Sequence, residues 1–187
     1  MLLTKIGEKN IIFYANKKEE EEKLEIKDIR IKIVSDRYDN TAPLLNAIDP
    51  ENAMPKLGKG AGEIDHDHTE VTTEAELVRD AGKTSIRYTE SELSGMDGAK
   101  TEISFYDAAP DTVTMDRGGD YMTSFVFETA KRHICIYNTP IMTFEMGVHT
   151  KEVKNRLFED GFIVLDYVLE IRGAGAERNR VRISLLN

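Results

Sequence analysis

The stretch "DIRIKIV" (residues 28–34) decides the fold class of this chain. Ile29, Ile31 and Ile33 alternate in it with charged residues. Successive side chains of a β-strand point to opposite faces, so this alternation predicts a strand with one face in a core and the other in water. The same two-residue period recurs along most of the remaining sequence.

Further segments repeat the alternation, separated by turn-forming runs such as "SGMDG" (94–98) and "GAGAER" (173–178). About ten short strands with few helices to cover them predict an all-β fold, a single antiparallel barrel of eight to ten strands. Closing the sheet on itself removes its exposed edges. The further segments are residues 70–77, 84–92, 101–107, 112–117, 123–129, 132–138, 141–150, 162–172 and 180–186.

The first 27 residues differ from the rest, because "NKKEEEEKLEIK" (16–27) is charged and has no apolar face. Such a segment buries little surface, so we expect residues 1–27 to form a solvated tail, disordered or helical. Two origins are open for residues 1–23: a native tail, or an upstream extension of a chain that starts at Leu24. Neither gives the segment a function.

The barrel domain is expected over residues 28–187, with two interruptions. Residues 40–62 contain three of the chain's five prolines and no sustained period, so we expect a long loop there. A flexible insertion is favoured over a functional lid. Residues 150–161 are compatible with a short helix or with the arm of a twisted hairpin.

Composition limits the classes of partner. A formal net charge of −9 disfavours nucleic acid, whose phosphates need clustered Lys and Arg, and it equally disfavours anionic membranes. The single cysteine, Cys135, cannot form an internal disulfide and fits a reducing compartment. No apolar run approaches the ~20 residues of a membrane-spanning helix. We therefore expect a soluble, cytoplasmic protein.

Several motifs occur together in order and resemble the YwiB-like family of small bacterial proteins over roughly residues 28–187. That family is a domain of unknown function with a calycin-like (lipocalin-related) β-barrel. The resemblance implies the same barrel here, and it implies no established activity and no catalytic residues. The motifs are "RYTESELSGMDG" (87–98), Arg117-Gly118, "RHICIYNTP" (132–140), "MGVHTKEV" (146–153) and "LDYVLEI" (165–171).

A candidate ligand site follows from extending the apolar faces of three strands. The face of Ile86 continues through Tyr88, Glu90 and Glu92, the face of Met115 continues to Arg117, and the face of Leu165 continues to Tyr167. A buried charge needs a partner, so Arg117 should meet Glu90 or Glu92 inside the barrel or at its rim. Two interpretations are open. The residues are either the polar part of a ligand-binding site, where Arg117 binds an anionic group, or a structural ion pair that closes one end of the barrel.

The strand at 132–138 has an ambiguous inward face. If His133, Cys135 and Tyr137 point inward, the histidine and the phenol join the candidate ligand-binding set. A cysteine nucleophile beside His133 would also need an orienting group and an oxyanion site, and the sequence identifies neither. We predict no catalytic residue, and we place His149 on the surface.

The stretch "EIDHDHTE" (63–70) puts His66, His68 and Glu70 on one face, the pattern of a two-histidine, one-carboxylate metal site. That face is the solvent face of the strand, because Val71 and Leu77 belong to the core face. We therefore expect a solvated strand end, with no metal and no cofactor.

The function predicted from the sequence is a small-molecule-binding barrel. A protein-interaction or homodimerising module, using patches near Tyr106, Tyr121 and Ile141, is the alternative. An enzyme of unknown class comes third, since no phosphate-binding loop, nucleophile elbow or zinc motif occurs.

Overall fold

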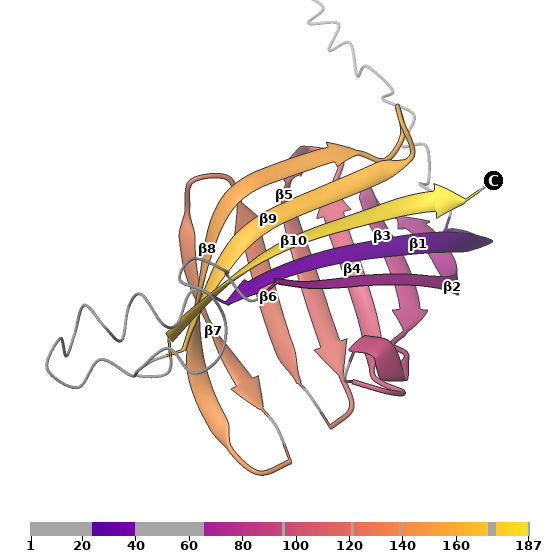
Figure 1. The fold of residues 1–187 in the computed structure, drawn as a ribbon. Coiled ribbons are helices and arrows are strands. Elements are labelled where there is room, and N and C mark those ends of the chain that lie inside the picture. The colour runs from indigo at the N-terminus through magenta and orange to yellow at the C-terminus, as the bar shows by residue number, and fades with distance from the viewer. Residues whose placement is uncertain are drawn as a thin grey trace, which may run out of the picture.

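Ten antiparallel strands form one sheet that curls into a nearly closed barrel (Figure 1). The computed structural model describes residues 24–186 apart from 40–65, 95, 121, 139 and 172–174. The strands are β1 (Glu25–Asp39), β2 (His66–Asp80), β3 (Lys83–Thr89), β4 (Lys100–Tyr106), β5 (Ala109–Gly118), β6 (Thr123–Glu128), β7 (Arg132–Asn138), β8 (Thr143–Arg156), β9 (Phe162–Ile171) and β10 (Gly175–Leu186), with a 3-10 turn, η2 (Glu92–Ser94), after β3.

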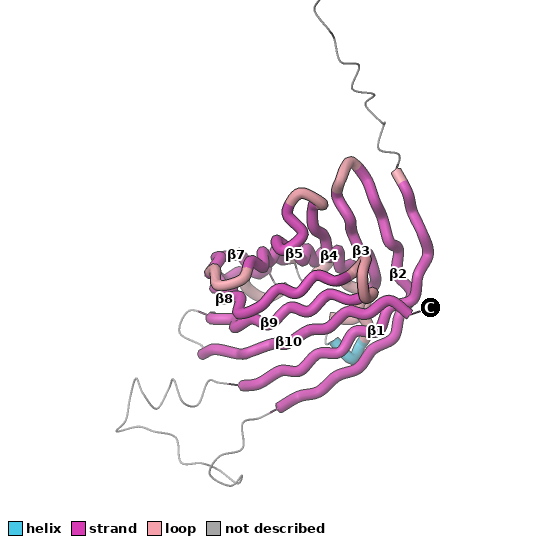
Figure 2. The backbone as a smooth tube through the Cα atoms, turned by 90° about the horizontal axis from the view of Figure 1, so that it is seen from above, coloured by secondary structure: helices cyan, strands magenta, loops and turns pink. Residues whose placement is uncertain are grey.

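The sheet consists of two meanders. Strands β1 to β6 pair in sequence, as do β7 to β10, and the ladder between β1 and β10 joins the two sets. The outermost strands, β6 and β7, meet where Met122 and Asn138 exchange backbone hydrogen bonds of 3.0 and 2.9 Å. Seen from above, the sheet bends round on itself (Figure 2). The all-β barrel predicted from the alternation is confirmed.

The strand boundaries depart from the expectation in two places. Strand β1 begins at Glu25, inside the segment expected as a tail. Strand β8 continues to Arg156, so residues 150–156 form a hairpin arm and not a helix. The expectations for residues 1–23 and for the loop at 40–62 fall outside the described residues. Among the described residues, no helix is long and apolar enough to cross a membrane.

The inward faces of the strands build the core. The rings of Phe127 on β6 and Tyr167 on β9 pack at an angle of 50°, with centroids 4.8 Å apart, so these two strands touch across the interior. Burying each such side chain contributes ~1.5–3 kcal/mol. The largest fully buried residues are Phe125, Phe127, Ile31, Ile86, Ile103, Met115, Ile163, Leu165, Ile183, Val113, Val148 and Thr84.

On the outer face of the barrel, the carboxylate of Glu102 on β4 contacts polar and charged side chains of β3. It accepts hydrogen bonds from Lys83 at 2.7 Å, Ser85 at 2.8 Å and Arg87 at 2.8 Å. Partial burial alone would raise the pKa of Glu102, but the three donors outweigh it and lower that pKa to about 2. The ionised form is therefore favoured in the folded protein.

We expect Glu102→Gln to lower the free energy of unfolding by about 1–2 kcal/mol at pH 7, after allowance for solvent screening. The folded pKa lies below the ordinary value of 4.5, so this stability is present above that pH and is lost as pH falls toward 2. Urea unfolding of both proteins at pH 7 and in acid measures it. A difference that stayed constant down to acid pH would contradict the charge-based explanation.

Candidate functional site

A row of polar side chains crosses the inner wall of the barrel from β3 to β6. In the strand ladders Tyr88 lies opposite Thr101, Thr101 opposite Arg117, and Arg117 opposite Thr123. Strand alternation places all four on the face of the apolar core. The row lies where β3 ends, β4 starts and β5 ends, so it marks one end of the barrel interior.

Arg117 and Glu90 form an ion pair within this row. Arg117 Nε lies 3.7 Å from Glu90 Oε1, with side chains 16% and 7% exposed. The same Oε1 accepts hydrogen bonds from Thr101 Oγ1 at 2.7 Å and from Tyr88 OH at 3.2 Å. Arg117 Nε itself is buried without a hydrogen-bond partner among the described residues. The inward arginine and its glutamate partner are thus placed as the alternation predicts.

Glu92 does not join this pair, which corrects the sequence prediction for that residue. The pleat of β3 ends at Thr89, and Glu90 closes a turn by donating its amide to Ala99 O at 2.8 Å. Glu92 then lies in η2 and is exposed. The two-residue period still holds at Glu90 but fails in the turn that follows it, which contains Glu92.

A second polar row crosses the other meander. Asn179 pairs with Tyr167 in the β10–β9 ladder, and Tyr167 pairs with Thr150 in the β9–β8 ladder. Burial raises the pKa of Tyr167 to about 12, although the positive charge of Arg117 opposes this rise. Thr150 Oγ1 is buried and lacks a hydrogen-bond partner among the described residues. The two rows therefore influence each other electrostatically inside the barrel.

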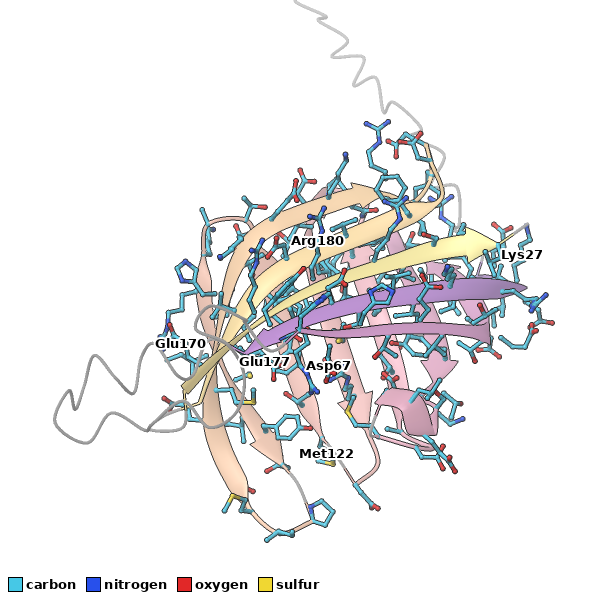
Figure 3. The ribbon with its side chains drawn as sticks, in the orientation of Figure 1. Lys27, Asp67, Met122, Glu170, Glu177 and Arg180 are labelled. Atoms are coloured by element: carbon cyan, nitrogen blue, oxygen red, sulfur yellow. The ribbon has the colours of Figure 1, made fainter. Side chains whose placement is uncertain are left out.

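A set of more solvent-exposed charged side chains continues the second row. Arg37 lies opposite Asn179 on one side and Asp67 on the other. Arg37 pairs with Asp67 and lies 3.9 Å from Glu177, and these three side chains are 53%, 67% and 38% exposed. Figure 3 shows Asp67 and Glu177 near one another. Sequence reasoning missed this set, although continuing the Ile31–Ile33 alternation would have reached Arg37.

Strand β7 turns His133, Cys135 and Tyr137 toward the barrel interior. Cys135 and Tyr137 pack against the core, while Ile134 and Ile136 on the opposite face are 57% and 51% exposed. This resolves the face that the sequence left ambiguous.

The candidate residues of β7 separate along the strand. Tyr137 lies next to the Asn138–Met122 bridge and so belongs to the Arg117 end. His133 lies at the opposite end of β7, where its Nε2 is 3.6 Å from Glu128 Oε2. The structure therefore brings Tyr88, Glu90, Arg117 and Tyr137 to one end of the interior. His133 lies away from them, and Tyr167 packs farther along the interior, against Phe127.

The cysteine shows no sign of an activated nucleophile. Its sulfur contacts Thr123 Oγ1 at 4.0 Å and the carbonyl oxygen of Met146 at 3.7 Å. Burial raises the pKa of the Cys135 thiol, which favours the protonated form. This environment fits a small core residue.

The two histidines of "EIDHDHTE" lie on the outer face, as the alternation predicts, and both are exposed. Asp36 of β1 lies between them: its Oδ1 is 3.1 Å from His66 Nε2 and 2.7 Å from His68 Nδ1. The hydrogen bond to Asp36 raises the pKa of His68. Sequence reasoning missed Asp36 because only the β1–β2 register, with Asp36 opposite His68, brings it there.

Two of the surface residues expected in an interaction patch are described. Tyr106 is 58% exposed and Ile141 is 92% exposed. Tyr121 lies outside the described residues. Self-association through this surface stays a prediction.

The fold and the inner polar rows define a β-barrel protein with a charged pair on its inner wall. Residues 59–183 match the model of the family DUF1934, a domain of unknown function, and the chain belongs to this family. The crystal structure of the ywiB protein from Bacillus subtilis is similar, with a TM-score of 0.54 and 12% sequence identity over 87% of this chain and 96% of that chain. The resemblance to YwiB-like proteins is confirmed at the level of the fold. A comparison with curated proteins gave no match.

Proposed function

We propose that this chain is a small-molecule-binding barrel whose ligand presents an acceptor group, such as a carboxylate, to Arg117. The observation that carries the proposal is the buried Arg117 Nε, which has no hydrogen-bond partner among the described residues. An unsatisfied buried donor costs ~1–3 kcal/mol, more when charged, and a ligand acceptor would recover that energy. Glu90, at 3.7 Å, is too distant to satisfy it.

The surrounding residues favour a ligand with a polar head and an apolar body. Tyr88 and Tyr167 keep their protons, because burial raises the pKa of both phenols. Tyr88 donates its hydrogen to Glu90, whereas Tyr167 can donate to a ligand. Thr150 Oγ1 is a further unpartnered group of the facing row. Toward the other end of the barrel the inward residues include the apolar side chains of Phe127, Val113 and Phe105. Pockets with a few converging polar groups on an apolar wall are typical of small-molecule sites.

Thermal unfolding with a library of small carboxylic acids and uncharged analogues tests the proposal. A ligand present at ~100 times its dissociation constant stabilises the folded state by about 2.7 kcal/mol, and we expect a rise in Tm of roughly 5–10 °C. The rise should persist in Arg180→Met, a matched exposed arginine on the outer face of β10, labelled in Figure 3.

The same rise should vanish in the double variant Arg117→Met/Glu90→Gln, which removes both charges of the pair together. Its own Tm without ligand serves as the reference, so a loss of stability is not mistaken for a loss of binding. A ligand that raises the Tm equally in both variants would contradict a role for Arg117.

A further inference from the structure

The outer face of β1 and β2 carries a second cluster of functional groups, separate from the barrel interior. Asp36, His66 and His68 each offer one ligand atom, and these atoms all lie within 4.8 Å of one another. The three side chains are 25%, 42% and 49% exposed, so the cluster is open to ions in solvent. Two imidazole nitrogens and one carboxylate oxygen suit Zn²⁺ and other borderline transition-metal ions better than Mg²⁺ or Ca²⁺.

The spacing of the ligand atoms is close to what such an ion needs. Asp36 Oδ1 lies 3.1 Å from His66 Nε2 and 2.7 Å from His68 Nδ1. A tetrahedral ion with bonds of ~2.0–2.1 Å separates its ligands by roughly 3.3 Å. Small side-chain rotations would therefore let the ion bind between Asp36 and the two histidines, which are now hydrogen-bonded to one another through Asp36.

The neighbouring residues orient the two imidazoles. The Tyr38 ring stacks on His66 with centroids 4.6 Å apart and an interplanar angle of 11°. Glu70 Oε1 lies 3.6 Å from His68 Nε2, the ring nitrogen that faces away from Asp36. Lys32 fixes Glu70 in turn, at 2.7 Å. A carboxylate behind the remote nitrogen of a ligating histidine is the common supporting arrangement of zinc sites, and it sets the tautomer that leaves the other nitrogen free to bind.

We propose that Asp36, His66 and His68 form a binding site for Zn²⁺ or a similar divalent transition-metal ion, with Glu70 as a positioning residue. Three protein ligands leave at least one position for water, since the site faces solvent. The ion would join β1 to β2 near the ends of both strands, where Asp36 and His66 are 30 positions apart in sequence. This proposal replaces the sequence expectation that the stretch binds no metal, and it does not depend on the proposed small-molecule site.

Titration of the tag-free protein with Zn²⁺ in competition with a chromogenic chelator tests the site. We expect one saturable equivalent in the wild type and at least a tenfold loss of affinity in His66→Ala, His68→Ala and Asp36→Asn. His149→Ala, an exposed histidine on β8, is the matched control and should bind as the wild type does. Glu70→Gln should weaken binding by about 10–100-fold without removing a ligand.

Two further measurements separate metal binding from the hydrogen-bonded cluster alone. Co²⁺ should give visible absorption bands of an imidazole- and carboxylate-bound ion in the wild type but not in His68→Ala. Zn²⁺ should also raise the Tm of the wild type and of His149→Ala, and raise it less in Asp36→Asn, His66→Ala and His68→Ala at the same concentration. Because the substituted side chains are exposed or, at Asp36, half-buried on the outer face, all variants should stay folded without metal. A wild type without saturable binding, or ligand variants that bind Zn²⁺ as tightly as the wild type, would overturn the proposal.

Discussion

Arg117→Met is expected to lower the free energy of unfolding by about 3–5 kcal/mol. Methionine fills much of the same volume but leaves Glu90, which is 7% exposed, as a buried carboxylate without its cation. Removing one partner of a buried ion pair is strongly destabilising, because the remaining charge has lost both its water and its countercharge. Urea or thermal unfolding of the two proteins at pH 7 measures the difference.

The double variant distinguishes charge from packing. Glu90→Gln in the Arg117→Met background should recover part of the loss, because the unpaired charge is gone while the side-chain shape is kept. Arg180→Met on the outer face should change stability by no more than ~0.5 kcal/mol. A loss below ~1 kcal/mol for Arg117→Met would mean that the pair behaves as a solvated one.

Phe127→Ala is also expected to lower the free energy of unfolding by about 3–5 kcal/mol. The Phe127 ring on β6 is fully buried and packs on Tyr167 of β9, so its removal leaves a cavity between these two strands. The closed strand ladders limit how far the walls can collapse into that space. Denaturant unfolding is the measurement, and the slope with denaturant should stay near the wild-type value.

Phe158→Ala is the matched control for this loss. Phe158 is 55% exposed, although its ring still meets Phe105 edge-on at 6.1 Å. We expect a loss of about 1 kcal/mol or less, because most of the ring already contacts water. Equal losses at the two positions would show that the space around Phe127 is not tightly packed.

The two-residue period predicted the barrel and the inward position of Arg117, because strand alternation is a local property of the backbone. Ile31, Met115 and Leu165 all lie where the alternation places them, and Arg117 follows Met115 inward. The period failed beyond the end of a strand: Glu92 lies in the 3-10 turn after β3 and is exposed.

Contacts between side chains of different strands could not be predicted, because they depend on the register between strands, which the sequence does not reveal. Asp36 meets the two histidines only because β1 and β2 pair with Asp36 opposite His68. The inward face of β7 was ambiguous from the sequence because isoleucines occupy its outward positions, Ile134 and Ile136. Exposed apolar residues on one face make the two faces of a strand indistinguishable by hydrophobicity alone.

The ladder between β1 and β10 has a consequence for the order in which the chain folds. Every other ladder joins strands that follow one another in sequence, whereas this one pairs Arg30 with Leu186 and Asp39 with Glu177. Closing a loop of that length costs roughly 4 kcal/mol of chain entropy before any contact forms. The meanders β1–β6 and β7–β10 can each form largely from neighbouring strands, but the barrel is complete only when the first and last strands meet. The rate-limiting step of folding should therefore be the docking of two half-formed sheets, on the millisecond-to-second scale of proteins dominated by non-local contacts.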